Sequence, residues 1–513
     1  MRWSHGWCAL LGLGLAGCGG APEAERPSGD DAAPRVEARG VEAPSLGCPP
    51  GTASRVKELT APGAGPVLFS NQYNGTDLLV DTGQALYLGT NFLDGRSVLW
   101  RSDGTPDGTV AVKSFPAGRG SVPRLDLLVA VGTKVFFTFD DADTTGNELW
   151  VSDGTDAGTH LVRDLEPGSE GSMLWNLTSL NGALVFLREV RTRPTEPNRF
   201  ELWRSDGSDL GTWRIAMLPR VDGYVRALRL RDTLLLFLAS PKEGTLLWRT
   251  DGTPHGTGFV RKLDSDTLNV TDALVGDGQG LFVVPDGDQW EVWRTNGSAS
   301  GTARLDTYGK PVTLLGGLGR FVYVAVTEPD TNRLHIERLA LGGGGKTRIA
   351  TLPNPYASDP DAYPYIERSA RLGQRLVFSM AISSSGPAPR EVRLWATDGT
   401  TAGTRQLPGA LIRSDERPSP LFPTGEGMLL FVASRDWMDN EVWFTWGDAA
   451  TTGQATDISP GPYGSAPMGF ARKGSHVLFL ALDDTGEWQL WAVPASLSCP
   501  PGLAGGERAS AER

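Results

Sequence analysis

The sequence has few of the residues that most metal and thiol chemistry requires. Four cysteines and five histidines among 513 residues offer little material for thiolate or imidazole metal sites. Positive charge is also short, since 48 lysines and arginines stand against 60 aspartates and glutamates and leave a net charge of −12. A chain that neutralises nucleic-acid phosphates needs a basic face, so we expect no nucleic-acid partner.

Catalytic and nucleotide-binding signatures are missing too. The sequence contains neither Gly-x-Ser-x-Gly nor His-Glu-x-x-His. Ala340–Thr347 resembles a phosphate-binding loop, but strand-like residues follow it, whereas such a loop needs a helix N-terminus behind it. We therefore expect no cofactor. The sequence does not show which acidic residues converge, so carboxylate-pair catalysis stays an open alternative.

Long hydrophobic runs are absent apart from Trp7–Gly17, which is too short for a membrane-spanning helix of about 20 residues. Residues 1–17 are typical of an export signal. Leu15-Ala16-Gly17-Cys18 resembles the bacterial lipobox, which predicts that Cys18 is acylated and holds the protein on a membrane. Gly19, not Asp, follows the cysteine, which by resemblance to lipoprotein sorting rules favours the outer membrane. We expect a lipid-anchored protein of the bacterial cell envelope.

The segments that flank the central region have few large apolar residues. Residues 18–47 are rich in Ala, Pro, Gly and acids, which predicts a disordered tether behind the lipidated cysteine, and we expect a second disordered segment at 501–513. Cys48 and Cys499 stand in matching Cys-Pro-Pro-Gly settings at the two ends of the region between them. In an oxidising compartment this pair predicts one disulfide, with two free thiols as the alternative.

What the sequence has in abundance is repetition. Glu148-Leu-Trp-Val-Ser-Asp-Gly-Thr-Asp-Ala-Gly-Thr159 recurs with a period of about 48 residues. The tryptophan of this motif is found at Trp100, Trp150, Trp203, Trp248, Trp293, Trp395, Trp443 and Trp491. Its loop aspartate or asparagine is found at Asp103, Asp153, Asp206, Asp251, Asn296 and Asp398. One further copy has Arg338 in the tryptophan place, which makes nine units.

Each unit contains short alternating apolar runs separated by Gly, Asp and Pro, and no stretch has helical periodicity with caps. Four strands in 45 to 50 residues is the content of one propeller blade. The pattern predicts an all-β protein in which residues 48–500 form a closed β-propeller of about nine four-stranded units. Because propellers usually have four to eight blades, eight blades plus an irregular sixth unit is the alternative.

The ends of the repeat array predict how the propeller closes. The ninth unit lacks the strand that follows the loop, and Gly51–Leu59 matches the missing piece, as in Gly158–Leu165. A first strand that completes the last sheet closes a ring and removes exposed sheet edges. A bond between Cys48 and Cys499 would then lock the seam.

These repeats resemble the ELWxxDGT repeat family of bacterial surface and secreted proteins, abundant in myxobacteria. The resemblance covers about 450 residues and departs at Arg338, at Trp446 in the loop aspartate place, and in unit nine, which lacks Gly-Thr. It implies a propeller-like fold and no common activity.

The repeated residues favour structural roles. The motif tryptophan alternates with polar neighbours, so we expect its ring to face the next blade, where burial stabilises the fold. The alternative, a platform for sugars, suits the off-pattern tryptophans better. These are Trp175, Trp213, Trp290, Trp437, Trp446 and Trp488. We expect the loop aspartates to cap the turn, since Asn replaces Asp once and a catalytic or calcium role would need the charge.

Two other features keep alternatives open. Asp141 and Asp143 begin like a calcium loop, but position 12 is Ser152 rather than a bidentate glutamate, so they are weak metal candidates and no metal is expected. The loop between the second and third strands varies most, and in unit three, Arg188–Arg199, it carries four arginines. Variable loops on one face of a repeat protein often form its binding face.

The sequence as a whole favours a monomeric, non-enzymatic binding or scaffold module anchored in the envelope, with a protein or glycan ligand on its variable loops. A propeller enzyme acting on polysaccharide is the first alternative, and a calcium-stabilised adhesin is the second.

Overall fold

The computed structural model describes residues 53–60, 67–71, 77–116, 125–141, 144–190, 196–221, 225–240, 243–263, 270–386, 389–411, 420–434, 439–460 and 464–497. These residues belong to one compact unit, Ala43–Arg513. The predicted signal, tether and tail, and with them Cys18, Cys48 and Cys499, lie outside the described ranges. Within those ranges no helix is long and apolar enough to cross a membrane.

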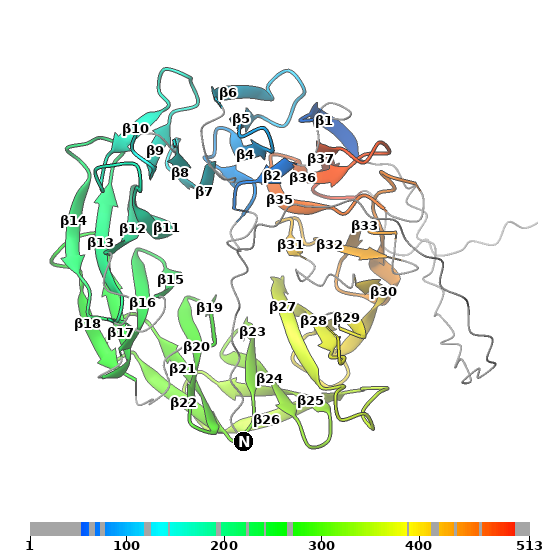
Figure 1. Ribbon diagram of the computed structural model, residues 1–513. Coiled ribbons are helices and arrows are strands. Elements are labelled where there is room, and N and C mark those ends of the chain that lie inside the picture. The colour runs from blue at the N-terminus through cyan, green and yellow to red at the C-terminus, as the bar shows by residue number, and fades with distance from the viewer. Residues whose placement is uncertain are drawn as a thin grey trace, which may run out of the picture. The chain divides into compact units, whose positions relative to one another are not determined.

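The described residues form nine antiparallel blades arranged in a ring, as Figure 1 shows. The middle of such a ring is the central channel of a propeller. Blade 1 has β2 (Val67–Phe69), β3 (Val80–Asp81), β4 (Leu86–Phe92), β5 (Ser97–Ser102) and β6 (Val110–Phe115). Blade 2 has β7 (Leu125–Val131), β8 (Lys134–Asp140), β9 (Asn147–Ser152) and β10 (His160–Arg163). Blade 3 has β11 (Met173–Leu180), β12 (Ala183–Val190), β13 (Arg199–Ser205) and β14 (Trp213–Met217). Blade 4 has β15 (Arg226–Leu230), β16 (Thr233–Ser240), β17 (Gly244–Thr250) and β18 (Gly258–Lys262).

The second half of the ring repeats this arrangement. Blade 5 has β19 (Asp272–Gly276), β20 (Gln279–Asp286), β21 (Gln289–Thr295) and β22 (Ala303–Tyr308). Blade 6 has β23 (Val312–Leu318), β24 (Phe321–Glu328), β25 (Arg333–Ala340) and β26 (Lys346–Leu352). Blade 7 has β27 (Pro364–Leu372), β28 (Arg375–Ile382), β29 (Glu391–Thr397) and β30 (Arg405–Leu411). Blade 8 has β31 (Leu421–Pro423), β32 (Leu429–Ser434), β33 (Glu441–Thr445), the 3-10 helix η1 (Ala449–Thr451) and β34 (Thr452–Gln454). Blade 9 has β35 (Met468–Lys473), β36 (His476–Leu482) and β37 (Trp488–Pro494).

The last blade takes its fourth strand from the other end of the chain. β1 (Ser54–Glu58) pairs antiparallel with β37, with Ser54 opposite Ala492 and Arg55 opposite Trp491. Gln489 strengthens this pairing, because its Oε1 accepts a hydrogen bond of 2.8 Å from the Leu59 amide. The sequence predicts this strand as the missing piece of unit nine, and β1 occupies that place beside β37.

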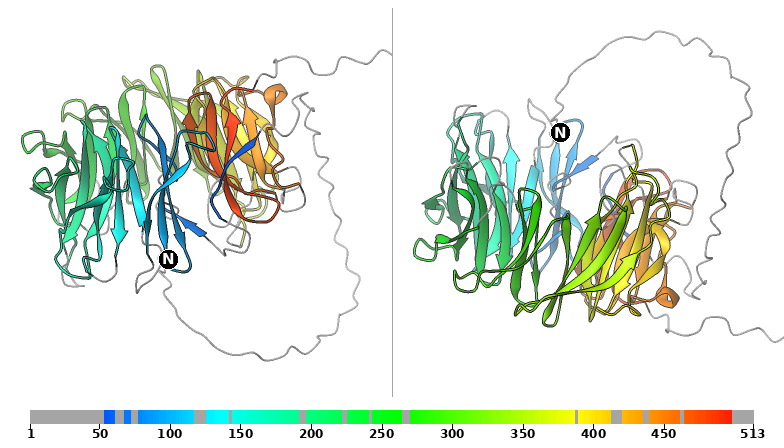
Figure 2. Two further views of the ribbon diagram at one scale, coloured as in Figure 1. Left: turned by 90° about the horizontal axis from the view of Figure 1, so that it is seen from above. Right: turned by 90° about the horizontal axis from the view of Figure 1, so that it is seen from below.

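Within each blade the chain runs from the channel to the rim, so the first strand is innermost and the fourth is outermost (Figure 1). Because neighbouring strands are antiparallel, the loop between strands three and four lies at the same face as the first hairpin. The loop between strands two and three lies at the opposite face, together with the crossover to the next blade. Figure 2 shows these two faces from the side. One irregularity joins blades 7 and 8, since β30 pairs with β32 through Ala410 and Leu411.

The hydrophobic core consists of layers between successive blades. Each of nine buried clusters combines residues of two neighbouring blades, and the cluster that joins the last blade to the first includes Leu490 and Leu88. Each motif tryptophan packs in such a layer; Trp293 and Trp443, for example, are each 2% exposed. The ring faces the preceding blade, not the next one as the sequence analysis predicted. The alternation of a strand shows which face a side chain takes, whereas the neighbour on that face follows from the direction of travel around the ring.

Candidate functional site

The loop between the third and fourth strands of each blade, here called the Asp-Gly loop, is a self-contained turn. The carboxylate Oδ1 of Asp153 accepts hydrogen bonds from the Thr155 amide at 2.9 Å and the Thr155 hydroxyl at 2.7 Å. Asn296 Oδ1 accepts the same two bonds from Ser298, at 3.0 and 2.8 Å. These bonds lower the pKa of the Asp153 carboxyl. The turn therefore needs a side-chain oxygen rather than a charge.

The same arrangement is found at the other predicted loop positions. The acceptors there are Asp103, Asp206, Asp251 and Asp398, each bonded by the amide and hydroxyl two residues ahead. In blade 8 Trp446 takes this position, and it packs partly buried against the apolar layer between blades 8 and 9.

A second feature of these loops was missed from the sequence. The hydroxyl of the residue before the loop aspartate pairs with the threonine hydroxyl that ends the loop, as in Ser152 with Thr159 at 2.6 Å. Blade 8 keeps this pair as Thr445 and Thr452 at 2.7 Å even though its aspartate is lost. The signal was present in the sequence, since Ser or Thr precedes every loop aspartate and Thr closes every loop.

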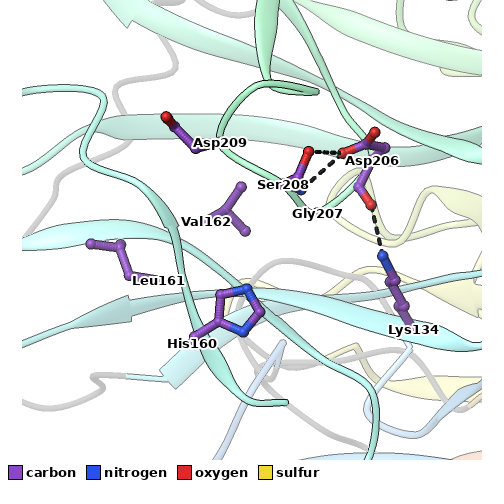
Figure 3. A pocket seen from close by; sticks show the side chains of 8 residues that line it. All are labelled: Lys134, His160, Leu161, Val162, Asp206, Gly207, Ser208 and Asp209. Atoms are coloured by element: carbon purple, nitrogen blue, oxygen red, sulfur yellow. Dashed lines mark hydrogen bonds between the residues drawn. The ribbon is translucent and has the colours of Figure 1, made fainter. Parts of the chain in front are cut away.

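Basic side chains tie several Asp-Gly loops to the preceding blade. Lys134 Nζ of blade 2 donates to the Asp206 carbonyl of blade 3 at 2.9 Å. Arg163 Nη1 donates to the Thr212 carbonyl of the same loop, also at 2.9 Å. A cavity of about 690 Å³ lies between these two blades, and Figure 3 shows His160 and the loop of blade 3 along its walls. Lys134 of the cavity lining is thus already used to join the blades, and the Asp206 carboxylate is bonded within its own loop.

The glutamate of the repeated motif is another structural residue that was missed. Glu148 is completely buried and accepts bonds from the amides of Leu165 and Glu166 and from the Ser172 hydroxyl. Burial outweighs these bonds and raises the pKa of the Glu148 carboxyl to about 7. Its contacts all lie in the crossover to blade 3. Glu441 caps the crossover of blade 8 in the same way, and Gln489 bonds the Leu59 amide in blade 9. In blades 3 and 5, by contrast, Glu201 and Glu291 bond the motif tryptophan and an arginine.

The weak metal candidates do not come together as a site in the described residues. Asp141 accepts bonds from the amides of Thr144, Thr145 and Gly146, which lower the pKa of its carboxyl, and Asp143 lies outside the described ranges. No group of three or more His, Cys, Asp and Glu side chains with metal-ligand placement occurs in the described part of the chain.

The variable loop of unit three is only partly described. Arg188 is mostly buried, and it forms ion pairs with Glu201 at 3.0 Å and with Glu166. Residues 191–195 of this loop lie outside the described ranges. Arg188, one of the four arginines counted from the sequence, therefore holds its own blade together.

The innermost strands of the blades are here called the channel wall, and their length differs from blade to blade (Figure 1). They are β2, β3, β7, β11, β15, β19, β23, β27, β31 and β35. A cavity of about 300 Å³ opens on this wall across β7, β11 and β15. Its lining residues include Leu127, Trp175, Asn176, Thr178 and Arg229. Trp175 is one of the off-pattern tryptophans predicted as ligand candidates, and it lines this cavity.

Trp175 is 44% exposed, and its Nε1 donates a bond of 3.0 Å to Glu189. Trp213 is 36% exposed at the outer rim on β14. Trp290 and Trp488 are partly buried in the layers between blades, and Trp437 lies outside the described ranges.

Acidic side chains on the channel wall mostly hold the wall itself together. Asp126 accepts the Asn71 amide at 2.6 Å, and Asp272 accepts the Leu314 amide at 2.7 Å. Asp81 forms an ion pair of 3.1 Å with Lys473. Glu367 differs, because burial raises the pKa of its carboxyl to about 7 and no hydrogen bond joins its side chain to another described residue.

Comparisons with known proteins assign the chain to no family. No family model matches the sequence, and no curated protein does. Among solved structures, one chain from a structural and mechanistic analysis of two prolyl endopeptidases is similar at 17% identity and a TM-score of 0.39, over 70% of this chain and 53% of that chain. The Dos1 propeller is similar at 10% identity and a TM-score of 0.41, over 76% and 94%. A puromycin-hydrolysing peptidase of Mycobacterium tuberculosis is similar at 13% identity and a TM-score of 0.40, over 85% and 61%. The chain thus spans about half the length of the prolyl endopeptidase chain that it resembles.

Proposed function

We propose that this chain is a non-enzymatic binding module of the bacterial cell envelope, anchored through Cys18, which takes a protein or glycan ligand at the wall of its propeller channel. One observation carries the proposal. An exposed aromatic ring, Trp175, lines a cavity of about 300 Å³ on that wall, within the size range of small-ligand sites. The Asp-Gly loops and the crossover caps, by contrast, have their polar groups satisfied within the scaffold.

The character of the channel wall supports binding over catalysis. Most general acid–base and glycoside chemistry needs two convergent titratable groups. Three of the four acids on the described wall strands are used by hydrogen bonds or an ion pair within the wall, and the wall strands contain no histidine.

The test is capture of glycans and envelope proteins by a soluble fragment that starts at Gly47. We expect at least one specific ligand whose capture is lost in Trp175→Ala and kept in Trp213→Ala, which removes another exposed tryptophan at the outer rim. Equal capture by both variants would place the binding surface elsewhere.

The enzymatic alternative has one observation in its favour, namely Glu367. Its carboxyl, with a pKa of about 7, suits a general acid near neutral pH. Hydrolysis of a captured polysaccharide that disappears in Glu367→Gln would support an enzyme and contradict the binding module.

The anchor is tested separately. Cys18→Ser should release the protein from membranes, because one acyl-bearing residue supplies the whole attachment. Persistent membrane association of this variant, measured by fractionation, would contradict acylation at Cys18.

A further inference from the structure

The wall cavity presents a fixed aromatic face. The Trp175 ring is 44% exposed, while its Nε1 is held by Glu189 at 3.0 Å. Because the hydrogen bond limits the motion of the indole, less conformational entropy is lost when a ligand packs on it. The electron-rich face of an aromatic ring attracts the weakly positive C–H groups of an apolar surface.

The backbone beside this ring has been bent out of regular register in two neighbouring blades. In β11 the residues between Trp175 and Thr178 form a bulge, and in β7 the residues between Asp126 and Val129 do the same. Each bulge contains a residue with φ of 52°, Asn176 and Leu127. A leucine in this region is strained, and such strain gathers at binding sites. Bulges also occur in β23, β27 and β35, but the two in β7 and β11 occupy corresponding positions in neighbouring blades and both line the cavity.

The third strand that lines the cavity, β15, carries a cation. Arg229 of β15 is exposed, and its Nε donates to the Arg231 carbonyl at 3.3 Å. Among the described residues no carboxylate forms an ion pair with Arg229. The two terminal nitrogens of a guanidinium held in this way remain available for the bidentate pairing that carboxylates favour.

The charge at the cavity favours an anion. The ten strands of the channel wall carry six basic residues, of which Arg371, Arg472 and Lys473 are paired with carboxylates. Arg229 is not among these pairs, so its positive charge is what an anionic ligand of the cavity meets. The Thr178 hydroxyl and the Asn176 amide nitrogen already donate to backbone carbonyls, so their oxygens are left to accept hydrogen bonds from the hydroxyls of a sugar ring.

We propose that this cavity binds one acidic sugar unit of a polysaccharide, with the C–H face of the ring on Trp175 and the carboxylate on Arg229. This inference rests on the proposed binding function and names its ligand class.

The experiment is calorimetric titration of the full chain with a short oligogalacturonate and, separately, with a neutral galactan of equal length. We expect the acidic ligand to bind at least about tenfold more tightly, since a charge-assisted pair contributes about that factor. The preference should shrink as salt is raised. Equal affinities for the two ligands would overturn the inference.

Variants assign the roles. Arg229→Gln should weaken the acidic ligand about tenfold or more and leave the neutral one unchanged, whereas Trp175→Ala should weaken both. Arg368→Gln is the matched control, because Arg368 is also an exposed arginine of the wall but does not line the cavity. Trp213→Ala is the control for the tryptophan. An equal loss in Arg368→Gln and Arg229→Gln would indicate general attraction by the wall and overturn the assignment of Arg229.

The two proposals fail in different ways. Capture of a neutral glycan or a protein that depends on Trp175 but not on Arg229 would refute the acidic sugar and leave the binding module standing. If every captured ligand binds Trp175→Ala as tightly as it binds the wild type, both the binding site at the wall and the acidic sugar are refuted. Melting curves that coincide with the wild type show that each variant is folded.

Discussion

The Asp-Gly loops and the channel wall belong to the same blades and yet differ in kind. The loops repeat one hydrogen-bond pattern from blade to blade, and Asn296 makes the same bonds as Asp153. The wall has bulges in β7, β11, β23, β27 and β35 but none in β15 or β19. What repeats is what each blade needs to fold, whereas what varies is available for recognition. The following predictions compare these two regions.

The largest difference should appear between two tryptophans. Trp293 is 2% exposed in the layer between blades 4 and 5, so Trp293→Ala should cost about 3–5 kcal/mol of unfolding free energy. Trp175 is 44% exposed on the wall, and Trp175→Ala should cost less than about 1 kcal/mol. Denaturant unfolding measures both, and similar costs would contradict the division into scaffold and site.

A pH dependence should trace to the buried cap of blade 2. The folded state raises the pKa of Glu148 to about 7 from an ordinary value near 4.5, so it holds the proton more tightly than the unfolded state. The resulting stability is complete below pH of about 4.5 and is lost as pH rises to about 7, with a total of about 2–3 kcal/mol. In Glu148→Gln this component of the slope should be absent. An unchanged slope between pH 5 and 8 would assign the titration to other groups.

The Asp-Gly loop should distinguish an oxygen from a charge. Asp153→Asn should change stability by less than about 0.5 kcal/mol, as Asn296 already suggests, whereas Asp153→Ala should cost about 1 kcal/mol, typical of a lost side-chain cap. Thermal melting of the two variants provides the measurement. A large loss in the asparagine variant would show that the charge itself is required.

The smallest effect is expected from chelation. The carboxylate of Asp141 is already bonded by backbone amides of its own loop, so a chelator should leave the melting temperature unchanged. A clear fall in melting temperature would support the calcium-stabilised adhesin instead.

Much of the fold was predictable because each blade repeats a local pattern. The motif tryptophans, the loop aspartates and the strand that completes the last sheet were all visible as sequence periodicity, and the structure has nine blades. The prediction that Trp150 faces the next blade was wrong, because the strand pattern does not show which neighbouring blade lies on which side. The hydroxyl pair of Ser152 and Thr159 was overlooked although both residues repeat.

The candidate site was harder to predict, since its parts are far apart in sequence. Trp175 stood out as an off-pattern tryptophan, but its exposure and its bond to Glu189 depend on the packing of β11 against β12. Leu127 and Arg229 carry no sequence signal, because each belongs to an ordinary apolar or alternating strand. They meet Trp175 only where three successive blades turn their first strands toward one channel.

By itself, the sequence determined the repeating unit, the number of units and the turn chemistry, because these depend on contacts between residues close along the chain. The tertiary structure alone decided which blade each tryptophan packs against, which acids are used within the scaffold and which side chains share the wall cavity. Those outcomes depend on how blades approach one another in space, and burial and bulges set them after the local pattern is complete.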